Sequence, residues 1–177
     1  MEGPKDDIFG KVSDDLDPFK KILSKIPGFS GYMERQKRRD SDKLIRDMIF
    51  KRFRLLEERV SRLQRDFISQ GGIMYVDDLE RTAINLRTFA DRVRTARRGY
   101  SGLFSAVKIN EEELTQLYEY DASMLDLVDE VDRAIDNVEA SIGSDGLPAA
   151  LRNLETLARR CVEVYEMREE IILQSQG

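Results

Sequence analysis

The segment LTQLYEYDASMLDLVDEVDRAIDNVEASIGSDGL, residues 114–147, decides the fold. Steps of three and four residues separate its seam positions, which is the spacing of a helix that packs along a coiled-coil-like stripe. The seam positions are 114, 117, 121, 124, 128, 131, 135, 138 and 142. The turn GSDG at 143–146 is too short for anything but a reversal, so the next helix returns along this one. The segment therefore predicts an antiparallel helical hairpin.

The centre of this turn sets the register of the hairpin. With the centre between residues 144 and 145, facing positions sum to 289, and most facing pairs are apolar. These pairs are Leu147 with Ile142, Leu151 with Val138, Leu154 with Ile135, Ala158 with Val131, Cys161 with Val128, Tyr165 with Met124 and Ile172 with Leu117.

The remaining pair is Asp121 with Arg168. Each of these residues is the polar interruption of the apolar stripe of its own helix. Because a buried carboxylate without a partner is costly, we expect a seam salt bridge that fixes the register. Tyr118 or Tyr165 is placed to donate a hydrogen bond to it. A catalytic role for Asp121 is the alternative that we rank lower.

A short amphipathic helix is predicted at residues 17–27, DPFKKILSKIP. Asp17 is the expected N-cap, Pro18 the first helical residue, and Pro27-Gly28 the stop. The apolar residues share one face, formed by Phe19, Ile22, Leu23 and Ile26. The lysines point elsewhere, and they are Lys20, Lys21 and Lys25. Residues 1–16 form an acidic tail that we expect to be flexible.

Long helices are predicted at about 31–69, 77–96, 110–142 and 148–173. Gly71-Gly72 ends the first, and capping-box spacings, Asp77 with Glu80 and Asn110 with Glu113, open the next two. The apolar surface of the first long helix widens, so we expect it to contact more than one neighbour there; the widening comes from Leu44, Met48, Phe50 and Leu55. The fold expected for residues 28–177 is all-α, a single antiparallel four-helix bundle of long helices.

The composition excludes several classes of function. The 177 residues include no histidine, one cysteine and no stretch of about 20 apolar residues. Histidine is the commonest metal ligand and the usual general base near neutral pH, and no phosphate loop ending in Gly-Lys-Ser/Thr is present. We therefore expect a protein that is not an enzyme and uses no cofactor, metal or small-molecule substrate. An enzyme built only on carboxylates, Lys, Tyr or Cys161 is the alternative that we rank lower. The single cysteine and an acidic N-terminus without an apolar signal region favour the cytoplasm.

Charge is segregated along the chain. Residues 18–104 hold 21 Lys/Arg against 11 Asp/Glu, whereas residues 105–145 hold 12 acidic residues against two basic ones. Candidate members of a basic surface are Arg35, Arg38, Arg39, Arg46, Arg87, Arg94, Arg97 and Arg98. We expect these charges to satisfy one another across the rim of the bundle. The alternative is a surface for an acidic protein or anionic lipid. The net charge of −5 and the lack of a recognised motif disfavour nucleic acid.

Two stretches, IPGFSGYMERQKRRDSDKLIRD and RTARRGYSGLF, resemble segments of an all-helical bacterial family of no assigned activity. The resemblance covers most of residues 26–130 and implies no particular chemistry. The pairing of an amphipathic N-terminal helix with a long helical hairpin is also similar in design to the phage-shock and ESCRT-III-like membrane remodellers. The chain departs from that design at Gly71-Gly72, which interrupts the long hairpin.

These observations favour a non-enzymatic helical scaffold or adaptor that acts through protein–protein contacts, including self-association. The alternative is a peripheral membrane protein that binds anionic lipid through residues 17–27 and the basic surface.

Overall fold

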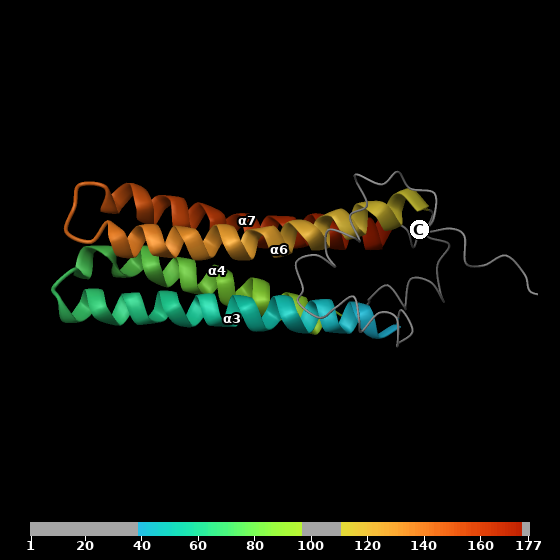
Figure 1. The fold of residues 1–177 in the computed structure, drawn as a ribbon, viewed down its shortest axis with the longest axis horizontal. Coiled ribbons are helices and arrows are strands. Elements are labelled where there is room, and N and C mark those ends of the chain that lie inside the picture. Colours follow the sequence, from blue (N-terminus) through green and yellow to red (C-terminus); the bar gives the residue numbers. More distant parts are fainter. Residues whose placement is uncertain (1–38, 97–110, 175–177) are drawn as a thin grey trace, which may run out of the picture.

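The computed structural model describes residues 39–96 and 111–174, which form four long helices and one short 3-10 turn. The long helices are α3 (Arg39–Ser69), α4 (Val76–Thr95), α6 (Glu111–Ala140) and α7 (Leu147–Gln174), and the 3-10 turn is η1 (Ile73–Tyr75). The part of the chain that the structure describes contains no strand, so the predicted all-α fold is confirmed. The helices form an elongated bundle with both hairpin turns at one end (Figure 1). The helix predicted at 17–27 lies outside the described residues.

The two hairpins are antiparallel internally but lie side by side with parallel helices between them. α3 packs on α4 and α6 on α7 within the hairpins, whereas α4 packs on α7 and α3 on α6 between them. Arg81 contacts Glu155 and Arg92 contacts Glu166, and this constant offset of 74 residues requires α4 and α7 to run parallel. The ring of contacts therefore has the order α3, α4, α7, α6, with the consecutive helices α4 and α6 at opposite corners.

Aromatic side chains join three of the helices in the core. Phe53 of α3 packs edge-on against Phe89 of α4, with ring centroids 4.4 Å apart, and Phe89 contacts Tyr165 of α7 at 6.3 Å. Edge-to-face pairs of this kind add to the free energy gained by burying the rings. The predicted stripe of α3 is buried throughout the described part: Ile45, Ile49, Phe53, Leu56, Val60, Leu63 and Phe67. Burial of this stripe against α4 and α6 fixes the face that α3 presents to solvent.

Two glycines end the first hairpin helix as the sequence predicts. Gly71 has a φ of +82°, a conformation that costs other residues about 1–2 kcal/mol. The N–H of Gly72 donates to the carbonyl oxygen of Phe67 at 2.8 Å, and the N–H of Gly71 donates to the carbonyl oxygen of Ile68 at 3.4 Å. This is the Schellman pattern, which satisfies carbonyls that the helix end would leave without donors.

Two predicted details of the helix ends are wrong. Asp77 is not an N-cap, because η1 leads directly into α4, whose N-cap is Tyr75 without a side-chain cap; Asp77 lies in the first turn. Ile142 does not extend the seam, because α6 ends at Ala140 and the Ile142 side chain lies 44% exposed in the turn. Asn110, predicted to cap α6, lies outside the described residues.

Candidate functional site

The predicted seam pair is present between α6 and α7. Arg168 Nε donates to Asp121 Oδ1 at 2.7 Å, and the two residues are 1% and 2% exposed. The Tyr165 hydroxyl, an expected donor to this pair, instead lies 3.0 Å from the carbonyl oxygen of Arg92 and 3.1 Å from the Glu169 carboxylate. The Tyr118 side chain lies outside the described residues. Enclosure of the pair in the seam supports the structural interpretation over the catalytic one.

The described members of the candidate basic surface contact their own bundle. Arg46 donates to the carbonyl oxygen of Ala96, and the Arg94 guanidinium lies 5.0 Å from the centre of the Phe50 ring, within cation–π range. Their charge is therefore directed at groups of this chain. The side chains of Arg35, Arg38, Arg39, Arg97 and Arg98 lie outside the described residues, as do Phe19, Lys20, Lys21, Ile22, Leu23, Lys25 and Ile26.

Glu57 is a buried carboxylate that sequence reasoning missed. It is 3% exposed and accepts hydrogen bonds from Arg87 Nη2 at 2.6 Å and from Ser61 Oγ at 3.2 Å, while Arg54 Nη1 lies 2.8 Å from its second oxygen. The hydrogen bond to Glu57 raises the pKa of Arg87. The position of Glu57 four residues after Phe53 placed it on the buried face. Its three polar contacts are typical of a satisfied structural group.

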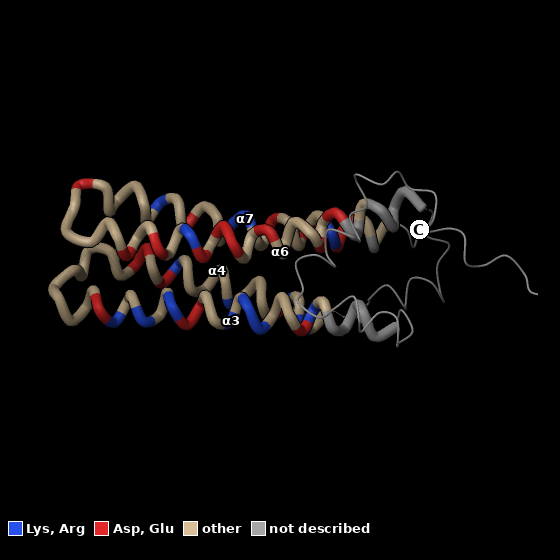
Figure 2. Tube along the Cα trace, in the orientation of Figure 1, with Lys and Arg blue, Asp and Glu red and all other residues tan. Residues whose placement is uncertain are grey.

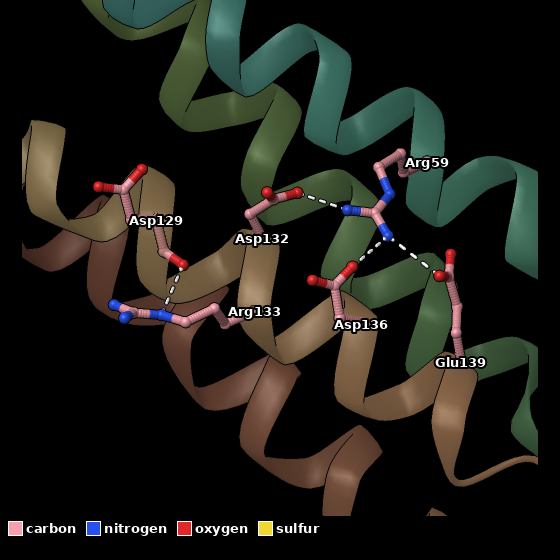
Figure 3. Close-up of polar contacts among 6 residues, drawn as sticks. All are labelled: Arg59, Asp129, Asp132, Arg133, Asp136 and Glu139. Carbon is pink, nitrogen blue, oxygen red and sulfur yellow. Dashed lines mark hydrogen bonds and ion pairs between the residues drawn. The ribbon is translucent and has the colours of Figure 1, made fainter.

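Arg59 joins the two hairpins on the side where α3 meets α6 (Figure 3). Its Nη2 donates to Asp136 at 2.8 Å and to Glu139 at 3.1 Å, and its Nη1 donates to Asp132. These carboxylates lie at i, i+4 and i+7 of α6, so they share one face of that helix. Burial lowers the pKa of Arg59, but the hydrogen bonds to Asp136 and Glu139 outweigh burial and hold the pKa above its usual value.

A groove of about 420 Å³ lies beside Arg59, between α3 and α6. Its lining includes two buried apolar residues, Leu56 and Val128, which form an apolar floor, and Leu55, which is 62% exposed. The first long helix does contact two neighbours, α4 and α6, and Met48 and Phe50 pack partly buried against the core, but Leu55 stays exposed. The Leu44 side chain lies outside the described residues. The charged residues on the α3 wall are Arg52, Glu58, Arg59 and Arg62, and those on the α6 wall are Asp129 and Asp132.

A second hollow, of about 510 Å³, lies between α6 and α7 near the opposite end of the bundle from the turns. Five polar side chains line it: Gln116, Glu119, Ser123, Glu170 and Gln174. The aromatic ring of Tyr120 and the apolar side chains of Met167 and Ile171 complete the lining. This hollow lacks facing walls of opposite charge. We therefore take the α3/α6 groove as the candidate functional site.

Three further findings bear on the site. Within residues 39–96 and 111–174, no group of three or more Asp, Glu or Cys side chains is arranged to hold a metal ion. None of the helices described is both long enough and apolar enough to cross a membrane. Comparisons of the chain with models of protein families, with curated proteins and with solved structures found no match.

Proposed function

We propose that the protein is a non-enzymatic helical scaffold that binds an amphipathic helix of a partner protein along the α3/α6 groove. The observation that carries this proposal is the exposure of Leu55 beside the apolar floor formed by Leu56 and Val128. Apolar side chains spaced along a groove between two helices are the usual receptor for the apolar face of a third helix. The groove would place a fifth helix against the bundle.

The walls of the groove specify the charge of the partner helix. Apart from Arg59 and Asp132, which bond to each other, the α3 wall carries Arg52 and Arg62 beside Glu58, whereas the α6 wall carries Asp129. A partner helix with an apolar stripe, acidic residues along one edge and basic residues along the other would match both walls. Flanking charges of this kind set partner choice in coiled coils. The protein partner is therefore defined by the charge of its two edges as well as by its apolar stripe.

Binding of synthetic helical peptides to the full chain tests this proposal. The matching peptide carries a leucine stripe with glutamates along one edge and lysines along the other; two control peptides keep the stripe but carry glutamates, or lysines, along both edges. We expect the matching peptide to bind most tightly, since each control places like charges against one wall. Fluorescence anisotropy of labelled peptides measures the three dissociation constants.

A matched pair of variants locates the binding surface. Leu55→Lys should weaken binding of the matching peptide at least tenfold, whereas Ile84→Lys, at a half-exposed isoleucine of α4, should leave it unchanged. Equal binding of the three peptides, or equal binding by the two variants, would overturn the groove as the site.

The alternative function is attachment to an anionic membrane through residues 17–27 and the basic surface. The contacts of Arg46 and Arg94 within the bundle favour the scaffold over this alternative. Sedimentation with anionic vesicles separates the two functions. Vesicle binding that falls with salt and is lost on Phe19→Glu would favour the membrane, whereas no sedimentation of the full chain would favour the scaffold.

A further inference from the structure

Exposed apolar side chains gather at the turn end of the bundle, on a surface that we call the apolar tip. Four of the eight large apolar side chains that are exposed in the described residues belong to it: Ile68, Ile73, Met74 and Ile142. They come from the last turn of α3, from η1 and from the α6–α7 turn, and both turns lie at the same end of the bundle (Figure 1). Monomeric proteins expose single apolar side chains freely, but a gathering of them marks an interaction site.

The register between α3 and α6 brings the two turns level. Arg59 contacts α6 residues that are 73 to 80 positions further along the chain. The same offset applied to Ile68 reaches residues 141–148, a range that includes Ile142. The apolar tip is therefore shared by both hairpins.

Carboxylates surround the apolar tip. Residues 65–80 hold four acidic residues against one arginine, with one of the four, Asp78, bonded to Arg81, and the α6–α7 turn holds Asp145 and no basic residue. Figure 2 shows an acidic position in the α6–α7 turn and further acidic positions on α3 and α4 close to the first turn. An anionic membrane surface and a second acidic tip would both be repelled. A segment that is apolar on one face and basic on the other would be attracted.

The chain itself contains a segment of that chemistry. The sequence of residues 17–27 predicts a helix with four large apolar residues on one face and three lysines elsewhere. We propose that the apolar tip of one copy binds residues 17–27 of a second copy, so that copies of the protein join head to tail. This interaction is separate from the groove of the proposed function and does not depend on it.

The length of the chain favours binding of the segment to another copy over binding to its own bundle. Along α3, Arg39 and Ile68 are about 44 Å apart at 1.5 Å per residue, and Ile73 lies beyond them. Residues 28–38 connect the segment to Arg39 and span at most about 40 Å when fully extended. A helical conformation of these residues would reach less far. With about 15 Å added by the segment's own helix, the segment reaches the tip of its own bundle only if residues 28–38 are almost fully extended, so a less extended connection leaves the tip accessible to a neighbour.

A contact between two different surfaces does not close on itself when two copies meet. Each added copy presents another tip or another segment, so association continues into chains unless the geometry closes a ring. The proposal therefore predicts species larger than dimers, with a mass that increases with protein concentration. It also predicts weaker association at high salt, because charge attraction contributes to the contact.

Sedimentation velocity of the full-length protein tests the proposal with two complementary variants. Ile73→Lys/Met74→Lys removes the tip, Ile22→Asp/Leu23→Asp removes the apolar face of the segment, and Ile84→Lys is the surface control. We expect the wild type and Ile84→Lys to form concentration-dependent oligomers, and each double variant alone to stay monomeric. The two double variants mixed in equal amounts should form a dimer and nothing larger, because one intact tip and one intact segment remain between them.

Three results would overturn the proposal. They are a wild type that stays monomeric at all concentrations, a tip variant that associates as strongly as the wild type, and a mixture of the two double variants that stays monomeric. Circular dichroism checks that the tip variant folds; if its helix content falls, the single variant Met74→Lys, at the most exposed tip residue, replaces it. Binding of the groove peptide by the tip variant is measured in parallel, so loss of self-association and loss of partner binding are distinguished.

Discussion

Arg168 of α7 and Asp121 of α6 form a charged hydrogen bond of 2.7 Å inside the seam of the second hairpin. Both charges lose their hydration there, and their attraction repays that cost only while they stay together. A shift of α7 by one helical turn would place Asp121 opposite Tyr165 or Ile172. The pair therefore disfavours a shifted register more strongly than it stabilises the correct one, which is the role that we infer for it.

Removal of one partner should destabilise the protein more than replacement of both. We expect Asp121→Ala or Arg168→Met alone to lower the free energy of unfolding by about 3–5 kcal/mol, since each leaves the opposite charge buried. The double variant Asp121→Leu/Arg168→Met should lie within about 1 kcal/mol of the wild type or above it. Urea unfolding followed by circular dichroism measures all four stabilities. Additive effects of the two single changes would contradict the coupling.

The seam pair could be predicted from sequence because a short turn leaves one arrangement for two helices. GSDG forces the reversal, and the apolar stripes on both sides then admit one register in which Asp121 meets Arg168. The same reasoning placed Leu151 and Leu154 in the seam, where the structure buries them. Local chain geometry was sufficient for these residues.

The contact between the hairpins could not be predicted in that way. The chain between α4 and α6 is long enough to place α6 beside either helix of the first hairpin, so the choice depends on packing of residues distant in sequence. Arg59 and its three carboxylates, and the groove beside them, follow from that choice. The exposure of Leu55 follows as well, since α6 covers Leu56 but leaves its neighbour open. The sequence did show that α3 is rich in basic residues and α6 in acidic ones, but it did not show which residues of the two helices lie opposite one another.

Loss of Arg59 should reverse the effect of salt on stability. In the wild type, salt screens the attraction between Arg59 and its carboxylates, so this contact weakens as sodium chloride rises. In Arg59→Met, Asp132, Asp136 and Glu139 are left to repel one another, and salt should stabilise the protein. We expect a cost of about 1 kcal/mol at low salt, because the carboxylates are exposed.

Thermal unfolding at 0.05 and 0.5 M sodium chloride measures this effect. Arg133→Met is the matched control, because Arg133 is exposed and its Nε donates to the Asp129 carbonyl oxygen of its own helix. The same salt response in Arg59→Met and Arg133→Met would show that Arg59 is not the main charge contact between α3 and α6.

A side chain at Gly71 should destabilise the first hairpin. Its φ of +82° disfavours any residue with a Cβ atom, so Gly71→Ala should cost about 1–2 kcal/mol even though the space around it is open. Gly146→Ala is the control: its Cβ would meet Ser144 Oγ at 3.5 Å, an ordinary contact, and we expect a change within about 0.5 kcal/mol. Urea unfolding midpoints compare the two variants. Equal costs would mean that conformation at Gly71 does not limit stability.

Alkaline pH should destabilise the bundle through two buried groups on α7. Burial raises the pKa of the Cys161 thiol to about 12, and burial together with the neighbouring Glu169 carboxylate raises the pKa of the Tyr165 hydroxyl to about 12. Both groups are neutral when protonated, and in the unfolded chain they lose their protons near pH 9 and pH 10. Between those values and about 12, the unfolded state binds fewer protons than the folded one, so stability falls as pH rises.

Each group should contribute a slope of about 1.4 kcal/mol per pH unit within its window, and full stability should be present below about pH 9. Cys161→Ala should remove the part of the loss that begins near pH 9, whereas Tyr165→Phe should remove the part that begins near pH 10. Urea unfolding at pH 8.5, 9.5, 10.5 and 11.5 gives the slope for each protein, and the slope is insensitive to a constant cost of the substitution. A Cys161→Ala variant with the wild-type slope between pH 9 and 10 would show that the thiol ionises as easily in the folded protein as in the unfolded chain.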